Sequence, residues 1–90
     1  MVYWAPELIL MDRYTHKADI WAVGVVLYNM LTGEHPFDTL DEDNFKQDVL
    51  TVNIDYSRLA TSRRLKVVIE NTLVVDPNSR WDASFILSWI

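Results

Sequence analysis

Residues 18–31, which read ADIWAVGVVLYNML, decide the fold. Aliphatic and aromatic side chains fill this stretch, and only Asp19 and Asn29 interrupt them with strongly polar groups. An α-helix built from it is apolar on every side, so it belongs at the centre of something larger. It is shorter than the ~20 residues that a membrane-spanning helix needs. We therefore expect a core helix with other elements packed around it.

Polar residues and breakers mark the two ends of this helix. Thr15 is a candidate N-cap, and Asp19 places a carboxylate near the free N–H groups of the first turn. Gly33 suits the left-handed closing position, and Pro36 blocks continuation. Gly24 in the middle costs about 1 kcal/mol relative to Ala, which predicts a close approach of another backbone segment.

Three further helices are expected, and together with the first they predict one all-α unit. They cover residues 41–50, 62–74 and the segment that begins near 82. The first is predicted to be mostly exposed, with Phe45 and Val49 as a narrow apolar stripe. Asp82 is a candidate cap for the last. Residues 51–59 read as an extended or irregular connection, because no partner strand is evident.

Size and composition fit a small folded domain. A chain of 90 residues buries roughly 60 to 65% of the surface that its unfolded form exposes. Half of the residues are hydrophobic and only two are Gly, which is too apolar for disorder and too poor in Gly for a turn-rich β domain. This composition favours the helical interpretation.

Charge and residue usage exclude several kinds of partner. A net charge of −5 opposes affinity for nucleic acid or for an anionic membrane surface. The chain has no Cys, and His16 and His35 lack zinc-like spacing, so we expect no metal site. No signal peptide is visible, and a cytoplasmic or other intracellular location is expected.

Three separated motifs occur in order: YWAPE at residues 3–7, DIWAVG at 19–24 and DPNSR at 76–80. They resemble late motifs of the protein kinase catalytic domain, whose activation segment ends in A-P-E. The resemblance implies a helical fragment of the kinase C-lobe, with one central buried helix and about three others packed on it. Residues 1–90 would then be a partial kinase domain, from the end of the activation segment through the last helix.

The resemblance also assigns structural roles. It implies that Glu7 and Arg80 meet as a buried, bidentate ion pair that staples the activation segment to the helical base. It implies that Asp19 accepts N–H bonds from the catalytic loop and so anchors that loop on the central helix. From the residues alone, Asp19 could instead be satisfied by the backbone of its own helix.

The first residues resemble the loop that receives the substrate. The resemblance implies that Val2, Tyr3 and Trp4 belong to the loop that, in the family, contacts the substrate residue following the phosphoacceptor. Tyr3, and the sequence LTGEHPF at 31–37, are similar to the serine/threonine branch of the family. The implied substrate is a protein Ser or Thr hydroxyl.

The motifs that carry out phosphoryl transfer are not in this sequence. Transfer needs a glycine loop over the phosphates, a nucleotide lysine, metal-binding Asp and Asn, and a base aspartate. We expect no catalytic, cofactor-binding or metal residue here. ATP and Mg²⁺ are expected for the complete parent domain, and the isolated chain is predicted to be inactive and to leave part of its central helix exposed.

Two alternatives remain. The parent could be a pseudokinase or a kinase-lobe mimic that regulates another kinase by docking through the region from Asp41 to Leu50. The chain could also be an unrelated helical interaction domain, which predicts that Glu7 and Arg80 lie far apart.

Overall fold

The structure, a computed structural model, describes residues 3–37, 39–59 and 63–89. Within those ranges every element of secondary structure is helical, so the predicted all-α class is confirmed. The elements are α1 (Pro6–Ile9), α2 (His16–Thr32), α3 (Glu42–Thr51), α4 (Arg63–Thr72) and α5 (Ala83–Trp89), with 3-10 turns η1 (Tyr56–Leu59) and η2 (Pro77–Ser79). No described helix is long and apolar enough to cross a membrane.

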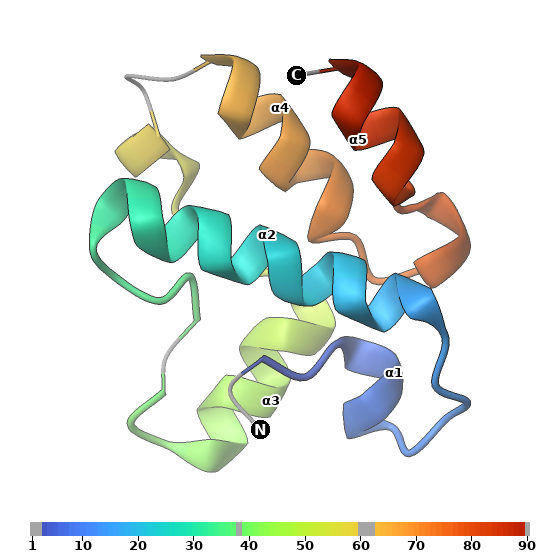
Figure 1. The fold of residues 1–90 in the computed structure, drawn as a ribbon. Coiled ribbons are helices and arrows are strands. Elements are labelled where there is room, and N and C mark those ends of the chain that lie inside the picture. Colours follow the sequence, from blue (N-terminus) through green and yellow to red (C-terminus); the bar gives the residue numbers. More distant parts are fainter. Residues whose placement is uncertain (1–2, 38, 60–62, 90) are drawn as a thin grey trace.

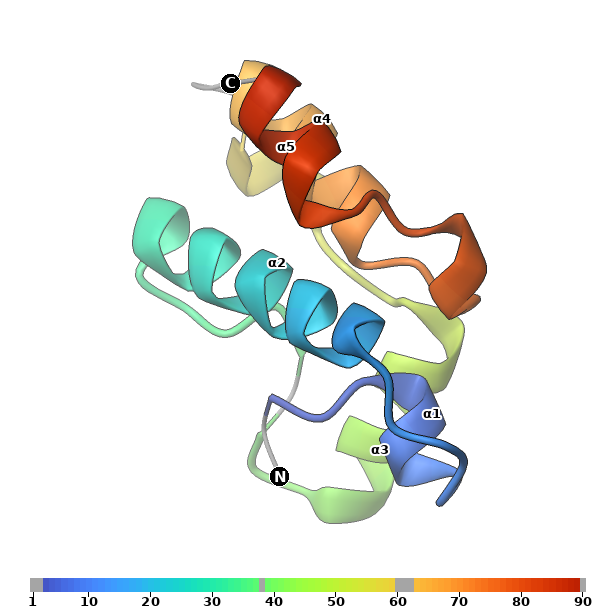
Figure 2. The same ribbon diagram turned by 45° about the vertical axis from the view of Figure 1, so that its right-hand side comes forward.

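Helix α2 lies in the middle of the fold. It runs between α4 and α5 on one side and α1 and α3 on the other (Figures 1 and 2). The hydroxyl of Thr15 accepts a hydrogen bond from the backbone N–H of Lys17 at 3.3 Å, and Gly33 closes the helix with φ of 78°. Thr15 and Gly33 therefore cap the helix as predicted, and the helix extends beyond residues 18–31 by one or two residues at each end.

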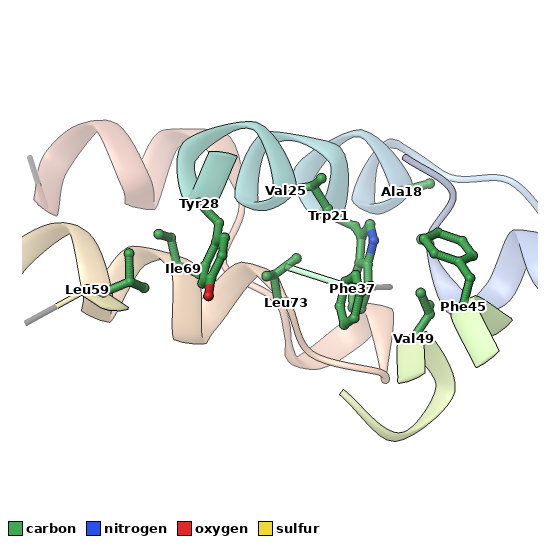
Figure 3. Close-up of a cluster of buried hydrophobic side chains, with 11 residues drawn as sticks. Ala18, Trp21, Val25, Tyr28, Phe37, Phe45, Val49, Leu59, Ile69 and Leu73 are labelled. Carbon is green, nitrogen blue, oxygen red and sulfur yellow. The ribbon is translucent and has the colours of Figure 1, made fainter. Parts of the chain in front are cut away.

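One side of α2 carries the core. Trp21, Val25 and Tyr28 point from α2 toward the other elements, as Figure 3 shows. The ring of Trp21 stacks on that of Phe37, with centroids 5.7 Å apart and planes 3° from parallel. Partners from the rest of the chain complete the same cluster, including Phe45, Val49, Leu59, Ile69 and Leu73.

Gly24 marks the crossing of α2 and α4. A Cβ at this position would lie 2.3 Å from the hydroxyl oxygen of Thr72 and 3.0 Å from side-chain atoms of Leu73. Another segment does come close, but the nearest atoms belong to the side chains of Thr72, the last residue of α4, and of Leu73, so the predicted approach of another backbone is wrong. A side chain at position 24 would therefore require Thr72 and Leu73 to shift.

The opposite side of α2 is uncovered. Val23 and Val26 are each 43% exposed and Met30 is 75% exposed. A helix that is apolar all round thus packs against neighbours on two sides and leaves the face with Val23, Val26 and Met30 exposed, within the described residues. This exposure agrees with the prediction from the sequence that part of the central helix is left exposed.

The shorter elements differ most from expectation. The one-turn helix α1 and the two 3-10 turns are not predicted by the sequence patterns. The connection expected to be irregular contains η1, and the hydroxyl of Tyr28 donates to the backbone oxygen of Asp55 at 2.8 Å just before it. Asp41 and Asp82 cap α3 and α5 by accepting backbone N–H bonds from Asn44 and Phe85.

Candidate functional site

A buried ion pair joins the two ends of the chain. Nη1 of Arg80 donates to Oε2 of Glu7 at 2.7 Å, and Nη2 donates to Oε1 at 2.6 Å. Glu7 lies in the first turn of α1 and Arg80 follows η2, 73 residues away in sequence. Both residues are buried, at 7% and 2% exposure. The unrelated-domain alternative predicts that they lie far apart, and it is therefore wrong.

Every donor of Arg80 is used. Besides its two bonds to Glu7, the guanidinium donates to the backbone oxygens of Val74 (2.7 Å), Lys17 (2.8 Å) and Val75 (3.2 Å). An arginine has five N–H donors, so none is left unsatisfied. The guanidinium carbon also lies 5.1 Å from the ring centroid of Trp21. Arg80 thereby holds α1, the start of α2 and the segment after α4 in one arrangement.

Asp19 lies at the head of the uncovered side of α2. Its carboxylate is exposed and accepts a hydrogen bond from the hydroxyl of Tyr14 at 2.6 Å. This bond raises the pKa of Tyr14 above its ordinary value, with smaller contributions from burial and from the negative charge of Asp19. No backbone N–H donates to the Asp19 carboxylate among the described residues, so its own helix does not satisfy it.

A shallow hollow continues from Asp19 along α2. It measures about 340 Å³ and is lined by Asp19, Ala22, Val23, Val26 and Leu27. The hollow is apolar except for the carboxylate at its end. Such a surface suits another protein segment that brings aliphatic side chains and one or more N–H donors.

The predicted substrate-side loop is described in part. Tyr3 and Trp4 are 51% and 45% exposed, while Val2 lies outside the described residues. The ring of Tyr3 lies 6.2 Å from that of His35, which in turn lies 5.8 Å from Phe45 of α3. The loop end therefore rests beside the connection from α2 to α3.

The described residues do not assemble a metal centre. No three His, Cys, Asp or Glu side chains among them are placed to hold one ion. Glu42 and Asp43 of α3 are exposed, and Glu42 pairs with Lys46 at 3.4 Å.

Two residues of this site escape prediction from the sequence. Tyr14 binds Asp19 from five positions upstream, and Lys17 contributes its backbone oxygen to Arg80 and donates its amine to the Arg80 backbone oxygen. Neither contact follows the three- or four-residue spacing of helix neighbours. No local signal marks them.

Comparison with known proteins gives consistent matches. The family described as "Protein kinase domain" matches residues 1–89. Serine/threonine-protein kinase srk1 of Schizosaccharomyces pombe is 38% identical over 100 aligned residues, covering all of this chain and 16% of that protein. The chain spans less than a quarter of the length of such curated relatives.

Solved structures agree. The twitchin kinase region of C. elegans matches with a TM-score of 0.89 and 29% identity, over 98% of this chain and 16% of that one. The Rad53 kinase domain with SCD2, in complex with AMPPNP, matches with a TM-score of 0.85 and 30% identity, over 98% and 37%.

Proposed function

The chain belongs to the protein kinase domain family, and we propose that residues 1–90 form the distal large lobe of a serine/threonine kinase. The parent protein transfers the γ-phosphate of ATP to Ser or Thr hydroxyls of a protein substrate. One observation carries the proposal: the Glu7–Arg80 pair, which joins the YWAPE and DPNSR motifs across 73 residues. Relatives named as serine/threonine kinases support the acceptor class.

The proposed role of the ion pair is to fix the substrate-side loop. Tyr3 and Trp4 stand directly before α1, and Glu7 in α1 is held by Arg80. A loop whose end is anchored this way keeps its geometry while a substrate binds, which lowers the cost of orienting the reacting hydroxyl. Val2, Tyr3 and Trp4 are proposed to contact the substrate residue next to the phosphoacceptor.

The uncovered side of α2 is proposed to receive the upstream remainder of the kinase domain. Val23 and Val26 offer apolar surface, and Asp19 offers a carboxylate whose only donor among the described residues is Tyr14. Backbone N–H groups of the catalytic loop would satisfy that carboxylate, as an ionised group leaving water requires. This contact would make Asp19 the anchor between the catalytic loop and the helical base.

ATP and Mg²⁺ are assigned to the parent domain and not to this chain. The Rad53 match, solved with AMPPNP, supports nucleotide binding in the family. Among the described residues, no three His, Cys, Asp or Glu side chains are placed to hold a metal ion. The chain supplies the substrate-side loop end and the structural base.

A second candidate function uses α3. The segment from Asp41 to Leu50 buries only Phe45 and Val49 and leaves much of its acid-rich remainder exposed, which suits docking of a regulator or of another kinase. In this case the parent is a pseudokinase or lobe mimic. The 90 residues are the same in both cases, so the discrimination depends on the upstream sequence.

The test begins with the reading frame upstream of Met1. An active parent carries a base aspartate and metal-binding Asp and Asn there. The parent domain is then incubated with radiolabelled ATP, Mg²⁺ and matched peptides that differ only in carrying Ser, Thr or Tyr. We expect transfer to Ser and Thr that disappears when the base aspartate is changed to Asn. A parent without these residues and without transfer supports the docking function, and transfer to Tyr alone refutes the acceptor class. An intracellular location stays a prediction.

A further inference from the structure

A second hollow lies between α4 and α5, away from the site described above. It measures about 420 Å³ and is lined by Arg63, Arg64 and Val67 of α4 and by Trp89 of α5. The two helices lie side by side in Figure 1, and hydrogen bonds between Arg64 and Trp89 join them. Its volume falls in the lower half of the range of small-ligand pockets.

One wall of this hollow is fixed in place. Arg64 donates from Nη1 to the backbone oxygen of Trp89 at 2.5 Å, and Trp89 donates from Nε1 to the backbone oxygen of Arg64 at 3.5 Å. The guanidinium also lies 5.7 Å from the Trp89 ring centroid, and the ring of Trp81 supports the indole at 5.4 Å. Despite these contacts Trp89 remains 38% exposed. A binding partner therefore meets an aromatic surface that is already oriented.

The charge of the hollow is opposite to that of the whole chain. Arg63 and Arg64 stand in the first turn of α4, which contains no acidic residue. Their charges add to the positive end of the helix dipole, where anions are favoured. None of the ion pairs among the described residues involves either arginine. A local cationic site thus persists on a chain with a net charge of −5.

We propose that this hollow binds an acidic peptide segment that carries an aromatic or aliphatic anchor side chain. The anchor packs on Trp89 and Val67, and carboxylates on either side of it pair with Arg63 and Arg64. Tryptophan and arginine are among the residues most enriched in the hot spots of protein interfaces. An anionic membrane surface is the less favoured occupant, because the overall negative charge of the chain opposes it. The proposal does not depend on kinase activity of the parent.

The test measures binding of a labelled synthetic peptide in which one Phe is flanked by Glu residues, by fluorescence anisotropy with the 90-residue chain. Arg63→Glu is expected to weaken binding about tenfold or more, because attraction becomes repulsion at the rim. The substitution places an acid in the first turn of α4, which favours the helix. Arg13→Glu, on the loop between α1 and α2, makes the same change in net charge and should weaken binding less than about twofold.

Two further peptides and one further probe complete the test. Replacing Phe by Ser, or every Glu by Gln, should each reduce binding about tenfold. The indole N–H resonance of Trp89 is identified in NMR spectra by its absence in Trp89→Phe. Loss or shift of this resonance when the peptide is added places the contact in the hollow. Equal weakening by Arg63→Glu and Arg13→Glu, or undiminished binding of either altered peptide, overturns the proposal. So does Arg63-dependent binding to phosphatidylserine vesicles without binding of the peptide.

Discussion

Removing Arg80 should destabilise the chain more than removing the charge of Glu7, although the two residues form one ion pair. Arg80→Leu leaves the Glu7 carboxylate, 7% exposed, without its donors. The substitution also removes the hydrogen bonds that Arg80 donates to the backbone oxygens of Val74, Val75 and Lys17. Glu7→Gln leaves these three backbone bonds intact.

The magnitudes follow from these contacts. Removing one partner of a buried ion pair costs roughly 3 to 5 kcal/mol, because the remaining charge has no counterion, and the lost backbone hydrogen bonds add to this cost. We therefore expect about 5 kcal/mol or more for Arg80→Leu. Glu7→Gln leaves the buried Arg80 charge without its counterion, but the guanidinium keeps its three backbone acceptors and one amide oxygen, so we expect about 3 kcal/mol. A domain of this size has a free energy of unfolding of roughly 5 to 13 kcal/mol. Arg80→Leu should bring it near the unfolding threshold.

Urea unfolding followed by tryptophan fluorescence measures the difference. Arg80→Lys, which keeps the charge but not the planar fork, should lie between the two variants and covers the case in which Arg80→Leu does not fold. Glu42→Gln is the matched control, because it breaks an exposed pair with Lys46 and should cost no more than about 0.5 kcal/mol. The reasoning is refuted if Glu7→Gln costs as much as Arg80→Leu, or if neither exceeds the control.

Three further outcomes are expected. Gly24→Ala should lower the free energy of unfolding by about 1 to 2 kcal/mol despite the better helix propensity of Ala, because its Cβ would lie 2.3 Å from the Thr72 hydroxyl oxygen. Adding Thr72→Ala should recover part of this stability in thermal melts, and a double variant no more stable than Gly24→Ala would contradict the explanation. Burial raises the pKa of Tyr56 from its ordinary 10.0 to about 12. The raised pKa contributes stability that is complete below pH 10 and is lost as the pH rises toward 12. Unfolding measured between about pH 10 and 12 should show this loss in the parent chain, and Tyr56→Phe should abolish that part of the pH dependence. The chain should bind a hydrophobic dye on the exposed face of α2. Replacing the exposed Val23 and Val26 by Ser should reduce the dye fluorescence without loss of helix, and unchanged dye fluorescence would contradict this placement.

The long elements are predictable from the sequence because their signals are local. Residues 18–31 carry continuous apolar character, and Thr15 and Gly33 mark the ends where the structure has them. Asp41 and Asp82 act as caps because a carboxylate near free N–H groups needs no distant partner. The motif resemblance adds the contact between the two ends of the chain, which no local pattern contains.

The remaining features depend on contacts that the sequence does not encode locally. The one-turn helix α1 is too short for a periodic pattern, so no hydrophobic spacing reveals it. An all-apolar helix also does not tell which side is covered, and the exposure of Val23 and Val26 is visible only in the structure. The backbone partners of Arg80 and the hollow between α4 and α5 likewise need the packed fold, because they join segments far apart in sequence.

The most direct test of the account is reconstitution of the kinase domain from two pieces. The 90-residue chain and the separately produced upstream remainder of its parent are assayed for transfer of radiolabelled phosphate to a Ser/Thr peptide, alone and mixed. We predict no transfer by the chain alone, transfer by the mixture, and its loss when Asp19→Lys is introduced on the face of α2 that the remainder covers. Transfer by the isolated chain above a heat-inactivated control, or full transfer by the remainder without the chain, would contradict the account.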